Sequence, residues 1–215
     1  MPEKKKPEGW DPAKAAWVPV TLTLTEPALG MTAGDPELVR EYLASKAPDM
    51  EKADEEVEAI EAMDVDEEMR KATTFFPKLE NGTPFLWDYQ IKGMFKDQAK
   101  ALRNVKGSHC SGLPAYRQKL DGLLFIRPRR VPLILPAGTA LGFMERPLRA
   151  QTPKGERIAL ARSETVPIGT AATFEFQAMM DELEPLVEEC LMYGQLRGLC
   201  QWRNAGWGRF TYKIG

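Results

Sequence analysis

Strand patterns and helix patterns are mixed along this chain instead of being grouped in separate halves. Residues 18–26 (VPVTLTLTE) alternate apolar residues with threonine, which predicts a strand with one buried face. A helix is predicted shortly afterwards, because Asp35 can act as its N-cap and Pro36 can occupy its first position. This helix is expected to end near Pro48, since proline interrupts the hydrogen bonds of a helix.

The mixed pattern continues to the C-terminus and predicts a fold class. Further helices are predicted from Asp88 to 105 and from Pro185 onward, and further strands over 123–130, 165–176 and 210–214. Residues 145–165 predict a β-hairpin that turns at TPKG (152–155). Elements in this order predict a single α+β domain over 1–215, of ferredoxin-like or RRM-like type, in which helices cover one face of an antiparallel sheet.

The formal net charge of −2 conceals two oppositely charged segments. Residues 35–70 contain 14 acidic and 4 basic residues, whereas residues 71–162 contain 17 basic and 6 acidic residues. Residues 50–70 have only a thin apolar stripe, typical of an exposed helix or a disordered loop, so we interpret 35–82 as an acidic helical insertion. The charge pattern indicates either a basic binding surface with an acidic appendage or an acidic segment that folds onto the basic one.

Composition excludes several classes of protein. No run of about 18 apolar residues is present, so no membrane span is expected. The first ten residues (MPEKKKPEGW) lack the apolar stretch of a signal peptide, which predicts a cytoplasmic protein. Cys110, Cys190 and Cys200 are odd in number and lack C-x-x-C spacing, so we expect half-buried thiols and neither disulfides nor a zinc site. No metal or other cofactor is expected.

Four segments carry a more specific signal: TLTLTEPALG (21–30), WDYQIKGMFKDQAKALR (87–103), VPIGTAATFEF (166–176) and YGQLRGLCQWRNAGWGRFTYKI (193–214). In this order they resemble the RAMP superfamily, the RRM-like subunits of CRISPR effector complexes. The second segment departs from the superfamily pattern, with Asp88, Tyr89 and Gln90 where Gly-Ser-Ser is preferred. The fourth departs at Cys200, where glycine is usual. The resemblance covers nearly the whole chain.

The resemblance implies a RAMP-like subunit of antiviral defence that binds single-stranded nucleic acid, first of all guide RNA, and assembles along the strand without catalysing a reaction. The basic hairpin at 145–165 resembles the thumb of the backbone subunits, which inserts between guide nucleotides and contacts the neighbouring subunit. Expected partners are single-stranded RNA or DNA, further copies of the chain, or other effector-complex subunits. An alternative is a solitary, phage-encoded relative that coats single-stranded DNA or interferes with CRISPR complexes.

The glycine-rich loop at 203–209 (RNAGWGR) is the leading candidate for contact with nucleic acid. Its glycines let the backbone approach phosphates and point N–H groups at them. Trp202 and Trp207 offer faces on which bases can stack, although a structural turn with core tryptophans would have the same sequence. Basic residues at a strand end or on a helix can likewise be ordinary surface charge. The predicted nucleic-acid-binding residues are Lys92, Lys96, Arg127, Arg129, Arg130, Arg149, Arg157, Arg162, Arg203, Gly206, Trp207, Gly208 and Arg209.

His109 is the candidate for an enzymatic role, because it is the only histidine. It lies in a polar loop with Lys106 and Ser108 and could be the general base of a metal-independent endoribonuclease, an activity found in the superfamily. An exposed histidine has the same context, and we expect no catalytic residue. Asp35, which lies where one branch of the superfamily uses an aspartate in metal-dependent cleavage, is explained by its N-cap role.

Overall fold

The computed structural model describes residues 16–46, 57–58, 61, 73–152 and 155–215. Its centre is a six-stranded sheet with the order β11-β1-β10-β7-β5, in which β6 pairs with β10 beside β7. All of these pairings are antiparallel, as predicted. The strands of this central sheet are β1 (Val18–Leu24), β5 (Phe85–Trp87), β6 (Leu124–Arg127), β7 (Arg130–Ile134), β10 (Ala171–Ala178) and β11 (Phe210–Ile214).

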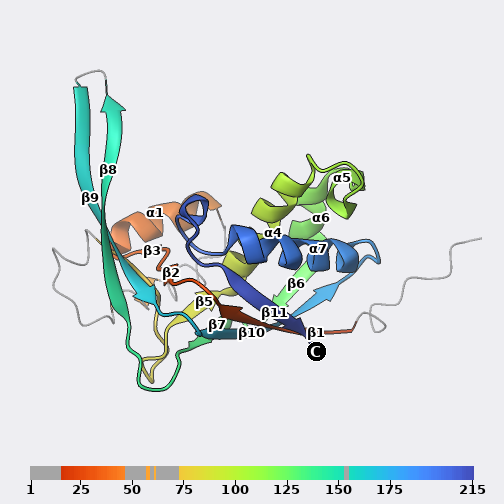
Figure 1. The fold of residues 1–215 in the computed structure, drawn as a ribbon, viewed down its shortest axis with the longest axis horizontal. Helices are drawn as coiled ribbons and strands as arrows, with labels where there is room; N and C mark the ends of the chain where they lie inside the picture. The colour runs from red at the N-terminus through yellow and green to blue at the C-terminus, as the bar shows by residue number, and fades with distance from the viewer. Residues whose placement is uncertain (1–15, 47–56, 59–60, 62–72, 153–154) are drawn as a thin grey trace, which may run out of the picture.

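Helices cover one face of the central sheet (Figure 1). They are α4 (Asp88–Leu102), α5 (His109–Gly112), α6 (Tyr116–Leu123) and α7 (Leu183–Arg197). The sequence β1, α4, β6 with β7, β10, α7 and β11 has the β-α-β-β-α-β order of ferredoxin-like folds, so the predicted fold class is confirmed. None of the helices in the described ranges has the length and apolar character needed to cross a bilayer.

A second, five-stranded sheet lies beside the first and is not predicted from the sequence. The order of four of its strands is β2-β9-β4-β3. Strand β8 lies off this path and pairs with β9 to form the hairpin, and β4 runs parallel to β9. Three of its strands have only two or three residues, too few for a hydrophobic period to be visible. The strands are β2 (Ala28–Leu29), β3 (Thr32–Ala33), β4 (Thr73–Phe75), β8 (Gly142–Thr152) and β9 (Gly155–Val166).

Strands β8 and β9 form the predicted hairpin, which is longer than expected because the pairing continues to Gly142, opposite Thr165. Thr152 is paired with Gly155 at its end, so the turn lies where the sequence predicts it. In Figure 1 the hairpin extends away from both sheets at the upper left, while its base is part of the second sheet.

Part of the predicted acidic insertion at 35–82 is built into the fold. Helix α1 (Pro36–Lys46) begins as predicted, and the Glu37 N–H donates to Asp35 Oδ1 at 3.0 Å. Strand β4 belongs to the second sheet, where it pairs with β3 and β9. The acidic segment 50–70, predicted as an exposed helix or a disordered loop, falls almost entirely on residues outside the described ranges.

Two predicted boundaries are corrected by the structure. The strand predicted over 123–130 is divided into β6 and β7, because Pro128 lies between them and proline has no N–H to donate to a sheet. The sequence predicts Asp88 as the N-cap of α4, but the helix starts one residue earlier than that cap requires. Its N-cap is Trp87, whose N–H donates to Gln90 Oε1 at 3.0 Å, and Asp88 is the first helical residue.

The hydrophobic core lies between the central sheet and helices α4 and α7. In β1 the side chains of Val20, Leu22 and Leu24 are buried, whereas Pro19 and Thr23 are exposed, as the alternation predicts. Burial of a side chain of this size contributes roughly 1.5–3 kcal/mol. A one-residue shift of register would expose all three, so the pattern determines which face of the sheet contacts the helices.

All three cysteines are free and buried, more deeply than the half-buried state expected from the sequence. The Cys110 and Cys190 sulfur atoms are 4.0 Å apart. A hydrogen bond with Cys110, together with burial, raises the pKa of the Cys190 thiol, and burial raises the pKa of the Cys200 thiol. Both thiols therefore stay protonated at neutral pH and act as small apolar side chains.

Candidate nucleic-acid interface

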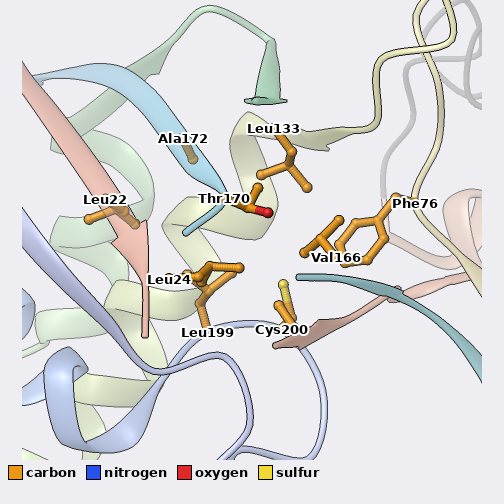
Figure 2. Close-up of a pocket in the computed structure, with 10 residues that line it drawn as sticks. Leu22, Leu24, Phe76, Leu133, Val166, Thr170, Ala172, Leu199 and Cys200 are labelled. Atoms are coloured by element: carbon orange, nitrogen blue, oxygen red, sulfur yellow. The ribbon is translucent and has the colours of Figure 1, made fainter. Parts of the chain in front are cut away.

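The connection between α7 and β11 contains the glycine-rich loop and begins in the core. Leu199 and Cys200 are buried and help to line a small apolar cavity where the two sheets meet (Figure 2). Leu22 and Leu24 of β1 and Val166 of β9 face the same space. Its volume is only about that needed for one water molecule, so it is a packing feature and not a ligand site. The loop is thus anchored immediately before it reaches the surface.

The glycines of the loop are required by backbone geometry. Gly208 has a φ of 68°, and a Cβ at this position would lie 2.2 Å from the Leu199 carbonyl oxygen. Its N–H donates to the Pro27 carbonyl at 2.8 Å, and the Gly206 N–H donates to the Arg203 carbonyl at 2.9 Å. These two N–H groups are therefore used inside the protein, and contacts from Gly206 and Gly208 to phosphates through them are not supported. The side chains of the loop are therefore the stronger candidates for contact with a ligand.

Trp202 and Trp207 lie at the surface of this loop and are not core residues. Their rings are stacked, with centroids 6.1 Å apart and planes inclined by 15°. Trp202 is 40% exposed and Trp207 is half-buried. Exposed aromatic faces beside basic side chains are groups on which unpaired bases stack.

The base of the hairpin meets the glycine-rich loop. The Arg146 guanidinium, from β8, lies 4.6 Å from the ring centroid of Trp202. Arg146 Nη2 donates to Gln201 Oε1 at 3.2 Å, and Gln201 Nε2 donates to the Gly30 carbonyl at 2.8 Å. Arg146 and Gln201 are outside the set predicted from the sequence, because only the folded structure brings β8 beside residues 201–202.

Arg203 and Arg209, the two arginines predicted in the glycine-rich loop, are partly engaged in contacts that hold the loop in place. Arg203 Nη2 lies 3.6 Å from Asp97 Oδ2 of α4, and Arg197 Nε donates to the same oxygen at 3.2 Å. Arg209 is exposed, and its Nε donates to the Leu196 carbonyl at 2.9 Å, at the C-terminal end of α7. Arg209 therefore offers a more accessible charge than Arg203.

A second group of predicted residues surrounds the first two turns of α4. Lys92 Nζ donates to the Asp121 carbonyl at 3.1 Å and lies 5.5 Å from the centroid of Phe125. Burial lowers the pKa of Lys92, an effect opposed by the charges of Asp121 and Asp88. Lys96 forms an ion pair with Asp121 at 2.7 Å.

The arginines of the β6–β7 region lie beside this second group and alternate with aromatic rings. Arg127 pairs with Glu175 and lies 4.2 Å from the ring centroid of Trp17. Arg129 is 3.6 Å from Asp88 and 4.9 Å from the centroid of Trp87. Arg130 lies 5.7 Å from the centroids of Phe85 and Trp87. The predicted residues thus form two groups, one at the glycine-rich loop and one at the start of α4, and each contains carboxylates.

Arg162 lies at the base of the hairpin but is paired with Glu145, so it points to the opposite face from Arg146, the hairpin residue that contacts the loop. Arg162 Nε is 3.6 Å from Glu145 Oε1, and its guanidinium lies 4.4 Å from the ring centroid of Phe143. Arg149 and Arg157 lie farther out, opposite Ile158 and Ala150 respectively.

His109 is the first residue of α5 and is exposed. Its backbone N–H donates to Glu189 Oε1 at 3.2 Å, and the Cys110 N–H donates to Oε2 of the same carboxylate at 3.1 Å. Glu189 is therefore used in capping α5. Within the described ranges, no group of three or more histidine, cysteine, aspartate or glutamate side chains is arranged to hold a metal ion.

Known proteins resemble this chain in structure and not in sequence. No protein-family model and no curated protein matches it. A chain in the cryo-EM structure of the Type III-B Cmr-beta bound to cognate target RNA is 12% identical, with a TM-score of 0.50 over 95% of this chain. This chain spans 61% of the length of that one.

Two further similarities have lower scores. A chain of a Type IV-B CRISPR complex is 13% identical, with a TM-score of 0.48 and coverage of 93% of this chain and 90% of that one. The crystal structure of Cmr6 from Pyrococcus furiosus is 11% identical, with a TM-score of 0.47 and coverage of 93% and 99%. With scores under 0.5 these two carry no argument. The Type III-B similarity and the β-α-β-β-α-β order together confirm the ferredoxin-like fold predicted from the sequence.

Proposed function

We propose that this protein is a non-catalytic subunit that binds single-stranded nucleic acid, with guide RNA as its ligand, and that it assembles along the strand within a CRISPR-type effector complex. The binding surface we propose consists of the hairpin β8–β9 and the glycine-rich loop. The observation that carries the proposal is the contact between them, in which the Arg146 guanidinium lies 4.6 Å from the Trp202 ring.

The chemistry of this surface suits a single strand. Arginine side chains neutralise phosphates and release their counterions, which drives binding at low salt. Exposed indole rings stack on unpaired bases, whose faces are covered by neighbouring bases in a duplex. Residues 71–162, which include the hairpin base, contain 17 basic and 6 acidic residues, so their charge favours a polyanion.

A nuclease function has less support from the geometry. A general base must reach the proton that it removes and is usually oriented by a partner group. The Glu189 carboxylate instead accepts a hydrogen bond from the His109 backbone N–H at 3.2 Å. We expect no cleavage of single-stranded RNA with or without magnesium. Efficient cleavage that is abolished by His109→Ala would support the endoribonuclease alternative.

The ligand can be identified by purifying the protein from cells and sequencing the nucleic acid that co-purifies. We expect RNA with recurrent guide sequences. Recovery of single-stranded DNA instead would favour the phage-type alternative, and recovery of no nucleic acid at low salt would contradict the proposed function.

A further inference from the structure

Trp202 has a backbone conformation that its side chain disfavours. Its φ is 55°, in the left-handed region, where a bulky residue is a genuine outlier. The residue is 40% exposed, so complete burial does not account for a tryptophan at this position. Backbone strain of this kind is concentrated at binding sites and persists where the surrounding structure enforces it.

The surrounding structure holds Trp202 firmly. Cys200, two residues earlier, is 5% exposed and faces the cavity between the sheets (Figure 2). The Gln201 side chain bridges Arg146 and the Gly30 carbonyl. The Ala205 N–H donates to the Trp202 carbonyl at 2.9 Å. A ring fixed before its ligand arrives loses little conformational entropy on binding.

Planar groups are already stacked around this ring. Trp207 lies at a centroid distance of 6.1 Å with nearly parallel planes, and the Arg146 guanidinium is 4.6 Å from the centroid of Trp202. Two nitrogens of Arg146, Nε and Nη1, are buried without a hydrogen-bond partner. Aromatic rings combined with an arginine are the arrangement by which proteins hold unpaired bases without reading their sequence.

We propose that the exposed part of the stacked Trp202–Trp207 pair, with the Arg146 guanidinium against it, is a stacking platform for one unpaired nucleobase. The platform rests on the proposed function. It specifies where on the proposed binding surface one base is held, namely beside the base of the hairpin. It recognises the aromatic face of the base and accepts any of the common bases. The left-handed backbone is the local cost of presenting the ring at the surface.

The test compares an ordinary single-stranded RNA with a strand of equal length whose bases are replaced by abasic sites. Both are titrated against the unmodified protein and Trp202→Gly, with fluorescence anisotropy as the readout. Glycine suits a φ of 55°, so this variant removes the ring without straining the loop. We expect Trp202→Gly to bind the ordinary strand about tenfold or more weakly, since stacking on one base is worth that factor. Both proteins should bind the abasic strand equally.

Two further variants serve as controls. Trp202→Phe keeps an aromatic face and should recover most of the affinity for the ordinary strand. Met192→Ala removes a large side chain that is 57% exposed on α7, and it should change neither affinity. Thermal unfolding is measured for each of these variants and for Trp202→Ala. Trp202→Gly should be at least as stable as Trp202→Ala, because glycine relieves the strain of the left-handed backbone.

The possible results separate the platform from the proposed function. If Trp202→Gly binds the ordinary strand as the unmodified protein does, the platform is overturned while nucleic-acid binding stands. If it weakens binding of both strands equally, Trp202 acts through loop structure or charge and the stacking role is overturned. If the unmodified protein binds neither strand, the proposed function fails and the platform with it.

Discussion

The Lys78 ammonium and the Glu164 carboxylate form an ion pair at 2.8 Å, and the Glu164 side chain is only 3% exposed. Glu164 lies in β9 at the base of the hairpin, and its other oxygen accepts the Phe76 N–H at 3.0 Å. The segment after β4 is thereby joined to the strand that leads into the hairpin. Removing the cation would leave a buried carboxylate without its countercharge.

We therefore predict that Lys78→Ala destabilises the protein by about 3 kcal/mol, the lower end of the range for breaking a buried pair. The matched control is Lys96→Ala, whose partner Asp121 is 53% exposed. That change should cost less than about 1 kcal/mol, because exposed pairs contribute little. Urea unfolding measures both. Equal losses in the two variants would show that Glu164 does not depend on Lys78.

A second prediction concerns two glycines of the same loop. Gly208→Ala should be strongly destabilising, because its Cβ would lie 2.2 Å from the Leu199 carbonyl oxygen. Gly206→Ala meets no atom closer than 3.5 Å and should cost only about 1 kcal/mol for its left-handed backbone. Thermal unfolding compares them. A Gly208→Ala protein as stable as Gly206→Ala would contradict the close packing between Gly208 and Leu199.

The fold could be predicted where an element is long enough to show a period. Strand β11 has the predicted bounds of 210–214, and the hairpin turn lies at the predicted position. The second sheet could not be predicted, because β2, β3 and β4 are short and their pairing depends on distant partners, such as Thr73 beside Arg162. Local patterns contain no information about such pairs.

The candidate site, like the fold, could be predicted from the sequence only in part. Charge and motif position single out the loop and the hairpin as separate segments, yet the contact between Arg146 and Trp202 depends on where β8 passes the loop. The N–H groups of Gly206 and Gly208, expected to point at phosphates, are used inside the protein for a related reason. Their N–H groups donate to carbonyls, one of them on Pro27, that only the folded chain brings near. That the remaining predicted residues bind nucleic acid stays a prediction.

A third prediction concerns the hairpin. Replacing Arg149, Arg157 and Arg162 with alanine should leave the fold intact, although the loss of Arg162, which is half-buried beside Glu145 and Phe143, should cost some stability. The slope of log affinity against log salt should fall by up to about two, roughly 0.7 for each phosphate that the variant no longer neutralises. Complexes on long single strands should also become smaller in light scattering, whereas complexes on short strands should not. Unchanged assembly on long strands would contradict a thumb-like role for the hairpin.

The central claim is that this protein binds single-stranded nucleic acid through a basic, aromatic surface. Fluorescence anisotropy with a labelled single-stranded RNA and the matching duplex, each titrated over a range of salt concentrations, tests it most directly. We predict tighter binding of the single strand and a Kd that rises steeply with salt, with a log–log slope of about 0.7 for each phosphate contacted. Weak binding that is the same for both nucleic acids and insensitive to salt would contradict it.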